Sequence, residues 1–272
     1  MHSGIDMLQT AVLALIQGLT EFLPISSTAH LALVPLLTGW PDQGLAFDCV
    51  VHLGTLTAVI LYFRADLGRM ATGFGRTISA RSWHADADGR MVWFIGLATI
   101  PVGLAGLAFK PLVEQALRSE VVIGTASVAF GLLLWWADRR AKRRRHDGDW
   151  RLGDTLLVGL AQAVALIPGT SRSGITMTAA LMLGYTREAA ARFSFLLSIP
   201  VILLSGGLAV RDWMQSPMQA VAWHQLLVGY ALSAASAFLC IHFFLKFIQR
   251  IGMGPFVLYR VALGTALLIA SR

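Results

Sequence analysis

Long apolar runs alternate with short polar segments along this chain, and the runs set the expected architecture. Six runs carry few charges, and each is long enough as a helix to cross roughly 30 Å of hydrocarbon. They cover residues 47–63, 92–109, 120–137, 188–210, 225–245 and 254–270. None of them alternates polar and apolar residues as a barrel strand does. The pattern therefore predicts an all-α integral membrane protein.

Two further apolar segments, 5–38 and 153–184, are interrupted near their middles by polar stretches around Pro24 and Pro168. The arms on either side of each interruption are short for a full crossing. Each segment is therefore predicted to enter and leave the membrane on one side as a re-entrant helical hairpin. A single transmembrane helix kinked at its proline is the alternative, because neighbouring helices can tolerate such kinks.

The order of these elements repeats, since one hairpin and three spans occur in each half. We assign residues 1–137 to the first repeat, 138–152 to a basic linker and 153–272 to the second repeat. An odd number of crossings separates the two hairpins, so they would enter from opposite sides and meet inside the membrane. This arrangement is an inverted-topology repeat, which in membrane proteins commonly encloses a binding site near the midplane.

Composition and charge agree with a membrane setting. The chain has 272 residues, of which 56% are hydrophobic and 14% charged, with a net charge of +7. Arg and Lys gather in segments 64–90 and 138–151, which we expect to be cytoplasmic loops of a bacterial inner-membrane protein with both termini periplasmic. The run 139–145 could also bind acidic lipid headgroups. Topology accounts for the basic residues without nucleic acid. Cys49 and Cys240 are expected to be buried thiols.

The first interruption is dense in polar chemistry. Gln17 and Glu21 lie one helical turn apart, on one helix face, before Pro24. Ser26, Ser27 and Thr28 then begin a new helix, whose free N–H groups favour an anion. His30, on its first turn, could serve as general acid/base or nucleophile beside Ser27. Each residue alone has a plain structural explanation, as a helix cap or a hydrogen-bonded core group. Together they predict a polar cavity, because unpaired polar groups in hydrocarbon cost several kcal/mol each.

The second interruption adds the opposite charge. Arg172 is flanked by Ser171 and Ser173. Gly169 and Gly174 bracket this segment and would let the backbone approach a ligand closely. A buried Arg favours a bidentate oxyanion, which we predict to be a phosphate. A structural ion pair with Glu21 is the alternative.

The chain resembles the undecaprenyl-diphosphate phosphatases, also called bacitracin-resistance proteins, over essentially its whole length. One hallmark of the family is (Glu/Gln)-x-x-x-Glu followed by Ser-Ser-Thr-x-His, represented here by residues 17–30. The other is Pro-Gly-x-Ser-Arg-Ser-Gly, represented by residues 168–174. The resemblance implies hydrolysis of undecaprenyl diphosphate to the monophosphate. That reaction recycles the lipid carrier of peptidoglycan synthesis and confers bacitracin resistance.

The resemblance also implies a divalent cation, Mg²⁺ or Ca²⁺, with Glu21 as a metal ligand. Many members have Glu where this chain has Gln17, so a metal-binding role for position 17 is in doubt. The expected catalytic residues are Glu21, Ser27, His30 and Arg172. The expected substrate-binding residues are Gln17, Ser26, Thr28, Gln162, Gly169, Thr170, Ser171 and Ser173.

In our mechanistic hypothesis the diphosphate enters from the periplasmic side, and its polyprenyl tail stays among membrane lipids between the helices. Ser27 is the preferred nucleophile, and a phosphohistidine at His30 is the second option. A polyprenyl-phosphate flippase is a separate functional alternative, because paired broken helices also build transporters. The sequence leaves the oligomeric state open, with a homodimer as one option.

Overall fold

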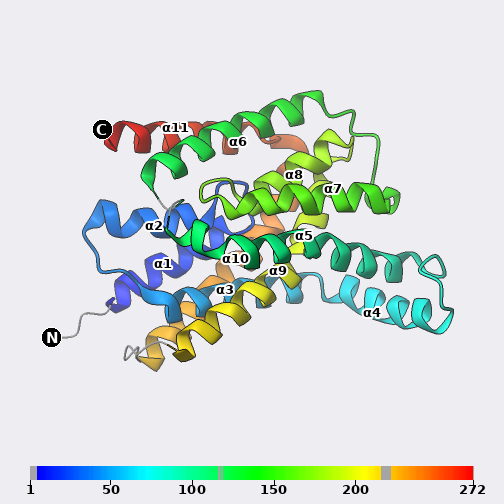
Figure 1. Ribbon diagram of the computed structural model, residues 1–272, viewed down its shortest axis with the longest axis horizontal. Coiled ribbons are helices and arrows are strands. Elements are labelled where there is room, and N and C mark those ends of the chain that lie inside the picture. The colour runs from blue at the N-terminus through cyan, green and yellow to red at the C-terminus, as the bar shows by residue number, and fades with distance from the viewer. Residues whose placement is uncertain (1–4, 116, 118, 216–221, 272) are drawn as a thin grey trace.

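The computed structural model describes residues 5–115, 117, 119–215 and 222–271, which form a bundle of helices (Figure 1). The first part of the chain contains α1 Met7–Thr20, α2 Ser27–Thr38, α3 Gly44–Tyr62, α4 Arg64–Ser79, α5 Ala87–Gln115 and α6 Glu120–Arg140. The second part contains η1 Asp147–Asp149, α7 Leu152–Ala163, η2 Val164–Leu166, α8 Arg172–Met182, α9 Arg187–Gln215, α10 Trp223–Ile251 and α11 Gly254–Ala270.

Five of the described helices, α3, α5, α6, α9 and α10, are long and apolar enough to cross a membrane. Four of them contain a run predicted from the sequence, and α3 covers the run 47–63 except for its last residue. The sixth predicted span is α11, which is apolar but has only 17 residues. Leu104, Leu227 and Leu258 are largely exposed on the outside of the bundle, as expected for side chains that face lipid. The protein is therefore a multi-pass membrane protein.

The basic segment 64–90, expected to be a loop, contains the amphipathic helix α4, so that expectation was wrong. Its buried residues Met70, Gly73 and Thr77 follow helical spacing and face α5. A Cβ on Gly73 would come within 2.6 Å of the Gly89 nitrogen, so only glycine permits this approach. The charges of the segment masked this apolar face in the sequence.

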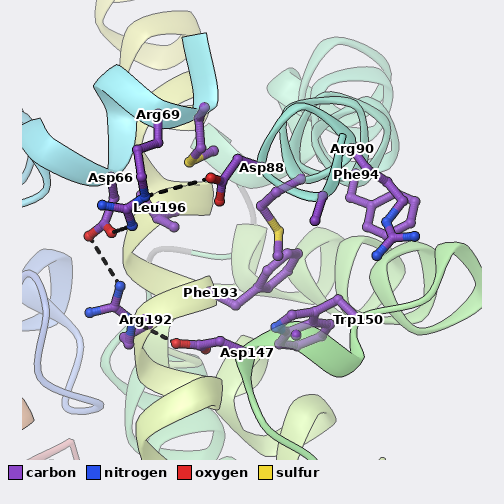
Figure 2. Close-up of a pocket in the computed structure, with 14 residues that line it drawn as sticks. Asp66, Arg69, Asp88, Arg90, Phe94, Asp147, Trp150, Arg192, Phe193 and Leu196 are labelled. Atoms are coloured by element: carbon purple, nitrogen blue, oxygen red, sulfur yellow. Dashed lines mark hydrogen bonds and ion pairs between the residues drawn. The ribbon is translucent and has the colours of Figure 1, made fainter. Parts of the chain in front are cut away.

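The linker 138–152 is also more ordered than a loop, because α6 continues to Arg140 and η1 follows. The Thr186 N–H donates to the backbone carbonyl of Arg145 at 2.8 Å. The guanidinium of Arg192 in α9 bridges Asp147 of the linker, at 2.8 Å, and Asp66 of α4, at 3.1 Å (Figure 2). A cavity of about 240 Å³ lies beside these ion pairs and is lined in part by Trp150. The linker is thereby anchored to both halves of the chain.

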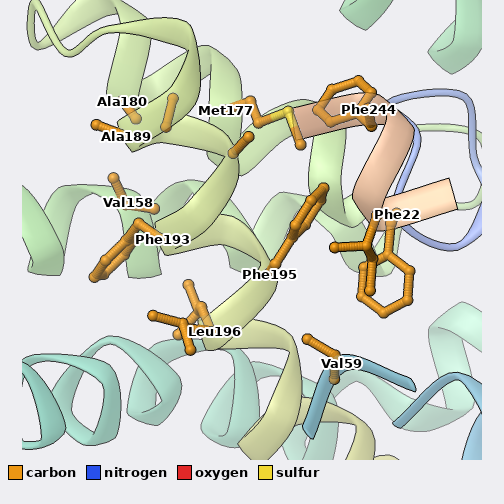
Figure 3. Packing of buried hydrophobic residues seen from close by; sticks show 14 of the residues in the cluster. Phe22, Val59, Val158, Met177, Ala180, Ala189, Phe193, Phe195, Leu196 and Phe244 are labelled. Atoms are coloured by element: carbon orange, nitrogen blue, oxygen red, sulfur yellow. The ribbon is translucent and has the colours of Figure 1, made fainter. Parts of the chain in front are cut away.

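The main apolar core lies where the two interrupted segments meet the long helices. Phe22, immediately after Glu21, is fully buried. Its ring packs edge-on against Phe195 of α9 with a centroid distance of 5.2 Å, and Phe195 contacts Phe244 of α10 (Figure 3). Met177 of α8 belongs to the same core. Aromatic pairs of this kind fix the depth and direction of the polar segment that follows Phe22.

Candidate active site

The first polar turn begins where α1 ends at Thr20 and closes where α2 starts at Ser27. Pro24 lies in this turn, and Ile25 N–H donates to the Leu23 carbonyl at 2.8 Å. Ser26, directly before α2, has φ 73°. Non-glycine residues are uncommon in this left-handed region, and such strained positions cluster at functional sites. The turn therefore presents the N-terminus of α2 together with its serines.

The second polar turn, between η2 and α8, has the same construction. Ser171 precedes α8 with φ 70°, and its Oγ accepts from Gly174 N–H at 3.2 Å as a helix cap. Gly169 has φ 91°, and a Cβ there would lie 2.4 Å from the Ile123 carbonyl oxygen. Both the positive φ of this residue and the lack of room for a Cβ therefore require glycine. Each turn thus places a left-handed serine immediately before a helix of eleven or twelve residues.

The two turns meet through hydrogen bonds between residues about 150 positions apart in the sequence. Arg172 Nη2 donates to Glu21 Oε1 at 2.8 Å, and Ser173 Oγ donates to the Leu23 carbonyl at 2.8 Å. Arg172 Nη1 also donates to the Ser194 carbonyl of α9 at 3.0 Å. Glu21 and Arg172, predicted from the inverted repeat to share one site, are therefore in direct contact, and the ion pair given as the alternative partner for Arg172 is present.

The Glu21 carboxylate organises the first turn as well. Its Oε2 accepts from Ser27 Oγ at 2.6 Å and from Gln17 Nε2 at 3.0 Å. The short Ser27 contact is typical of a hydroxyl donating to an ionised oxygen. Ser27 is therefore held with its proton directed at a carboxylate. This arrangement prepares the hydroxyl oxygen to act as a nucleophile.

A cavity of about 260 Å³ opens between the turns. Its lining residues are Glu21, Ser26, Ser27, Thr28, His52, Ala165, Leu166, Pro168, Gly169, Ser171, Arg172, Val201, Ile202 and Ser205. The N-termini of α2 and α8 both face it, so backbone N–H groups and the positive ends of two helix dipoles favour an anion there. Hydroxyl, carboxylate and guanidinium groups thus share one polar space inside an apolar bundle.

Not every predicted site residue lines this cavity. His30 lies behind it, where Nδ1 donates to the Ser26 carbonyl at 2.7 Å and Nε2 is 2.6 Å from the Tyr259 hydroxyl. A carbonyl can only accept, so Nδ1 carries a proton, and in the neutral imidazole Nε2 then accepts from Tyr259. The lone pair that an attacking imidazole needs is therefore occupied, and Tyr259 stacks on the ring.

Four further predicted residues are buried without lining the cavity. Ser173 connects the turns, as described above, and Gln17 holds Glu21. Gln162 is fully buried in α7, and its amide has no hydrogen-bond partner within the described part of the chain; the same holds for the Thr170 hydroxyl. Buried polar atoms of this kind usually contact ordered water.

The sequence reading missed His52, which lines the cavity from α3. Its Nε2 is 3.9 Å from Glu21 Oε2, and its Nδ1 contacts the Asp48 carbonyl at 2.7 Å. The signal was present in the sequence, because a histidine inside an apolar span is a functional candidate by default. It was overlooked because it lies outside both motifs.

With this geometry in view, the sequence was compared with known families. Residues 10–266 match the model of the family described as "Bacitracin resistance protein BacA". The chain belongs to this family. The matched region includes both polar turns and every helix that lines the cavity.

Curated relatives support the same assignment for this BacA family member. A protein named undecaprenyl-diphosphatase 2 in Stutzerimonas stutzeri (strain A1501) is 54% identical, covering 97% of this chain and 98% of its own. A protein named undecaprenyl-diphosphatase in Teredinibacter turnerae is 56% identical, covering 97% of this chain and 99% of its own. A third, from Nitrosococcus oceani with the same name, is 53% identical.

The donors around Glu21 can be tested against the divalent cation expected from the family. Within the described residues, no group of three or more His, Cys, Asp or Glu side chains could hold a metal ion. Gln17 Oε1 is a buried oxygen without a hydrogen-bond partner in the described part of the chain. The Glu21 carboxylate and the Ser27 hydroxyl, which line the cavity, fit Mg²⁺, which keeps several waters and takes other ligands from substrate phosphates. They do not form an all-protein Ca²⁺ cage.

Proposed function

We propose that this protein hydrolyses undecaprenyl diphosphate to undecaprenyl phosphate and inorganic phosphate, and so returns the lipid carrier for peptidoglycan synthesis. The observation that carries the proposal is the contact between Ser27, Glu21 and Arg172 in a cavity faced by two helix N-termini. A nucleophile, its base and an oxyanion clamp are the three parts that phosphoryl transfer needs. The relatives that carry this name are similar over nearly the whole chain.

The terminal phosphate would bind between the turns. Arg172 uses two of its five N–H groups on Glu21 and on the Ser194 carbonyl, among the described residues. The remaining N–H groups can donate to phosphate oxygens in the bidentate geometry that guanidinium favours. Because Glu21 and Arg172 already form an ion pair, the clamp is held in place before substrate arrives. Such preorganisation is a major source of catalysis.

In the first chemical step, Ser27 Oγ attacks the terminal phosphorus while its proton passes to Glu21. The bond from phosphorus to the bridging oxygen breaks, and undecaprenyl phosphate leaves. Glu21 passes the Ser27 proton to the departing undecaprenyl phosphate and is ionised again. Water then attacks the phosphoserine and gives a proton to Glu21, which returns it to Ser27 Oγ as inorganic phosphate leaves. His52 faces Glu21 and can share this proton. The occupied Nε2 of His30 favours Ser27 over a phosphohistidine.

We also propose that a divalent cation assists, with Glu21 as its protein ligand, while Gln17 holds this carboxylate by donating to it at 3.0 Å. When bound, the ion would neutralise charge on the phosphate oxygens. Ser26, Thr28 and Ser171 would bind the remaining phosphate oxygens, while Gln162 and Thr170 support the turns from behind.

The re-entrant, inverted-repeat architecture is part of the proposal. In the two repeats, α1 corresponds to α7, α5 to α10 and α6 to α11. The helix contacts follow this correspondence: α1 packs on α10, α7 packs on α5, and α6 packs on α11. The first hairpin (5–38) and the second (153–184) would then occupy equivalent places in repeats 1–137 and 153–272. Inverted repeats place their shared site near the midplane.

The basic linker would be cytoplasmic and the cavity would open to the periplasmic side of the bacterial inner membrane. Ser205, towards the far end of α9 from the linker, lines the cavity and supports this orientation. The polyprenyl tail would lie among membrane lipids. The proposed site uses residues of one chain only, so it could form in a homodimer as well as in a single chain.

Phosphate release tests the proposal. Purified protein in detergent, given undecaprenyl diphosphate and Mg²⁺, should release one inorganic phosphate per lipid and leave the monophosphate. The Ser27→Ala variant is the matched control for contaminating phosphatases. A preparation that releases no phosphate with Mg²⁺ or Ca²⁺, yet moves the lipid across vesicles, would replace hydrolysis with transport.

A further inference from the structure

Arg260 lies in the middle of α11, a helix that otherwise faces apolar surroundings, and its side chain is fully buried. A cation at this depth is expensive unless its hydrogen bonds are satisfied. Among the described residues no carboxylate pairs with it. Instead, Nε donates to the Ser127 carbonyl of α6 at 3.2 Å, and the other donors reach the two polar turns.

Both turns are held by this one guanidinium. Arg260 Nη1 donates to the Pro24 carbonyl of the first turn at 3.3 Å. Nη2 donates to the carbonyls of Gly169 and Thr170 of the second turn, at 2.9 and 2.8 Å. Breaking a helix leaves such carbonyls without intrahelical partners, and no water is available for them in hydrocarbon. One planar guanidinium, with donors on several sides, supplies what the broken backbone lacks.

These bonds also decide which way the second turn faces. In a planar trans peptide, the C=O and N–H groups point in opposite directions. With the Thr170 carbonyl fixed on Arg260, the Ser171 N–H of the same peptide unit must point away from α11. Ser171 lines the catalytic cavity, and its N–H has no hydrogen-bond acceptor among the described residues. A free backbone donor is thereby aimed where phosphate would bind.

The neighbouring residue strengthens the arrangement. Tyr259, one position before Arg260, contacts His30 of the first hairpin at 2.6 Å. Tyr259 of α11 therefore contacts His30 of the first hairpin, and the next residue, Arg260, binds backbone carbonyls of both turns. A helix far from the two sequence motifs fixes the backbone of each.

We propose that Arg260 is a positioning residue for phosphoryl transfer: it holds the carbonyl sides of both turns so that the Ser171 N–H and the Glu21–Arg172 pair face the substrate. Arg260 does not touch substrate. The inference rests on the proposed function. It assigns a mechanistic role to a residue outside both motifs.

Arg260→Lys is the first test. Lysine keeps the charge but cannot span carbonyls on three segments. We expect amide hydrogen exchange in peptides 20–30 and 164–175 to rise at least about tenfold, because the turns open locally. We expect kcat to fall by ~10²–10³, the effect of losing one oxyanion donor, with KM changed by less than about threefold.

Arg187→Lys is the matched control for a lost guanidinium. Arg187 binds both oxygens of Asp138 at 2.7 and 2.8 Å, and neither residue lines the cavity. This variant should lower thermal stability without changing exchange in the two turns or kcat. If the control alters the turns as strongly as Arg260→Lys, the effect is general destabilisation and the proposal fails.

Gly131→Ala tests the same idea with every charge in place, and it decides the matter if Arg260→Lys does not fold. The three atoms nearest to a Cβ at Gly131 of α6 would all belong to Arg260, with its Cβ at 3.2 Å and Nε at 3.6 Å. A shift of a few tenths of an ångström should lower kcat about three- to tenfold, since a displacement of 1 Å can cost ~10². Gly96→Ala, in α5 with nothing within 4 Å of its Cβ, should leave kcat unchanged.

The exchange measurement separates this inference from the proposed function. If the parent protein releases no phosphate, the proposed function fails, while exchange in the turns still reports whether Arg260 holds them. If folded Arg260→Lys and Gly131→Ala both keep the parent exchange and kcat, Arg260 is not a positioning residue.

Discussion

Replacing Glu21 by Gln removes one charge from the centre of the site and preserves its shape. The carboxylate accepts from Arg172 at one oxygen, and from Ser27 and Gln17 at the other. In the variant, the amide oxygen should face Arg172, because two donors cannot face each other. The NH₂ group then faces Ser27, and Gln17 can turn its unpaired Oε1 towards it. All three hydrogen bonds can therefore form in the variant, but Ser27 and Gln17 become acceptors instead of donors.

The cost in stability should be modest and the cost in activity large. The Arg172 contact keeps its charged donor, while the contacts of Ser27 and Gln17 become neutral hydrogen bonds, which contribute about 0.5–1.5 kcal/mol each instead of about 1.5–3. The penalty of 3–5 kcal/mol for a buried unpaired charge should not be reached. The Arg172 side chain is 13% exposed and faces the cavity, which reduces that penalty. Ser27 loses the acceptor for its proton, so kcat should fall by ~10²–10⁴. KM should fall slightly, since the site becomes more positive.

Phosphate release from undecaprenyl diphosphate and thermal unfolding in detergent measure both effects. Glu188→Gln is the control, because Glu188 is exposed on the first turn of α9. It should change neither quantity. Glu21→Gln protein that keeps kcat within about threefold of the parent would refute Glu21 as the base, and a raised KM with normal kcat would limit it to binding.

Further predictions address the nucleophile, the clamp, the turn and the topology. Ser27→Ala should lower kcat by at least ~10³ with little change in KM, and His30→Ala should be milder; an acid-labile phosphoryl adduct on His30 would reverse this order. Arg172→Lys should lose most activity in the same assay, because a point charge cannot form the bidentate contact. Gly169→Ala should fail to give a stable protein in thermal unfolding, since its φ and space both exclude a Cβ. A reporter enzyme that works only in the cytoplasm should be active when it is fused after residue 145.

Several features of this protein were fixed by local sequence. The apolar runs alone located α3, α5, α6, α9 and α10, because crossing hydrocarbon requires a minimum length of uncharged helix. The two polar interruptions located the turns. The expected meeting of Glu21 and Arg172 followed from the order of elements, and their 2.8 Å contact confirms it. Their catalytic roles stay predictions.

Other features depended on contacts between distant segments. Residue spacing singled out His30, which follows Ser27 by three positions, and did not point to His52 at all. The left-handed Ser26 and the contact with Tyr259 turn His30 behind the cavity, while α3 brings His52 to Glu21. Spacing along one helix gives no information on which side of a broken turn a ligand will lie.

Arg260 illustrates the same division. The sequence shows a lone cation in an apolar run, which marks it as important but does not identify its partners. Those partners include the backbone carbonyls of Pro24, Gly169 and Thr170, at least 90 positions away in the chain. Carbonyls are present at every residue, so no side-chain pattern can reveal which of them are left unpaired. Only the folded arrangement of two broken helices exposes them at one point, where a single guanidinium can satisfy them.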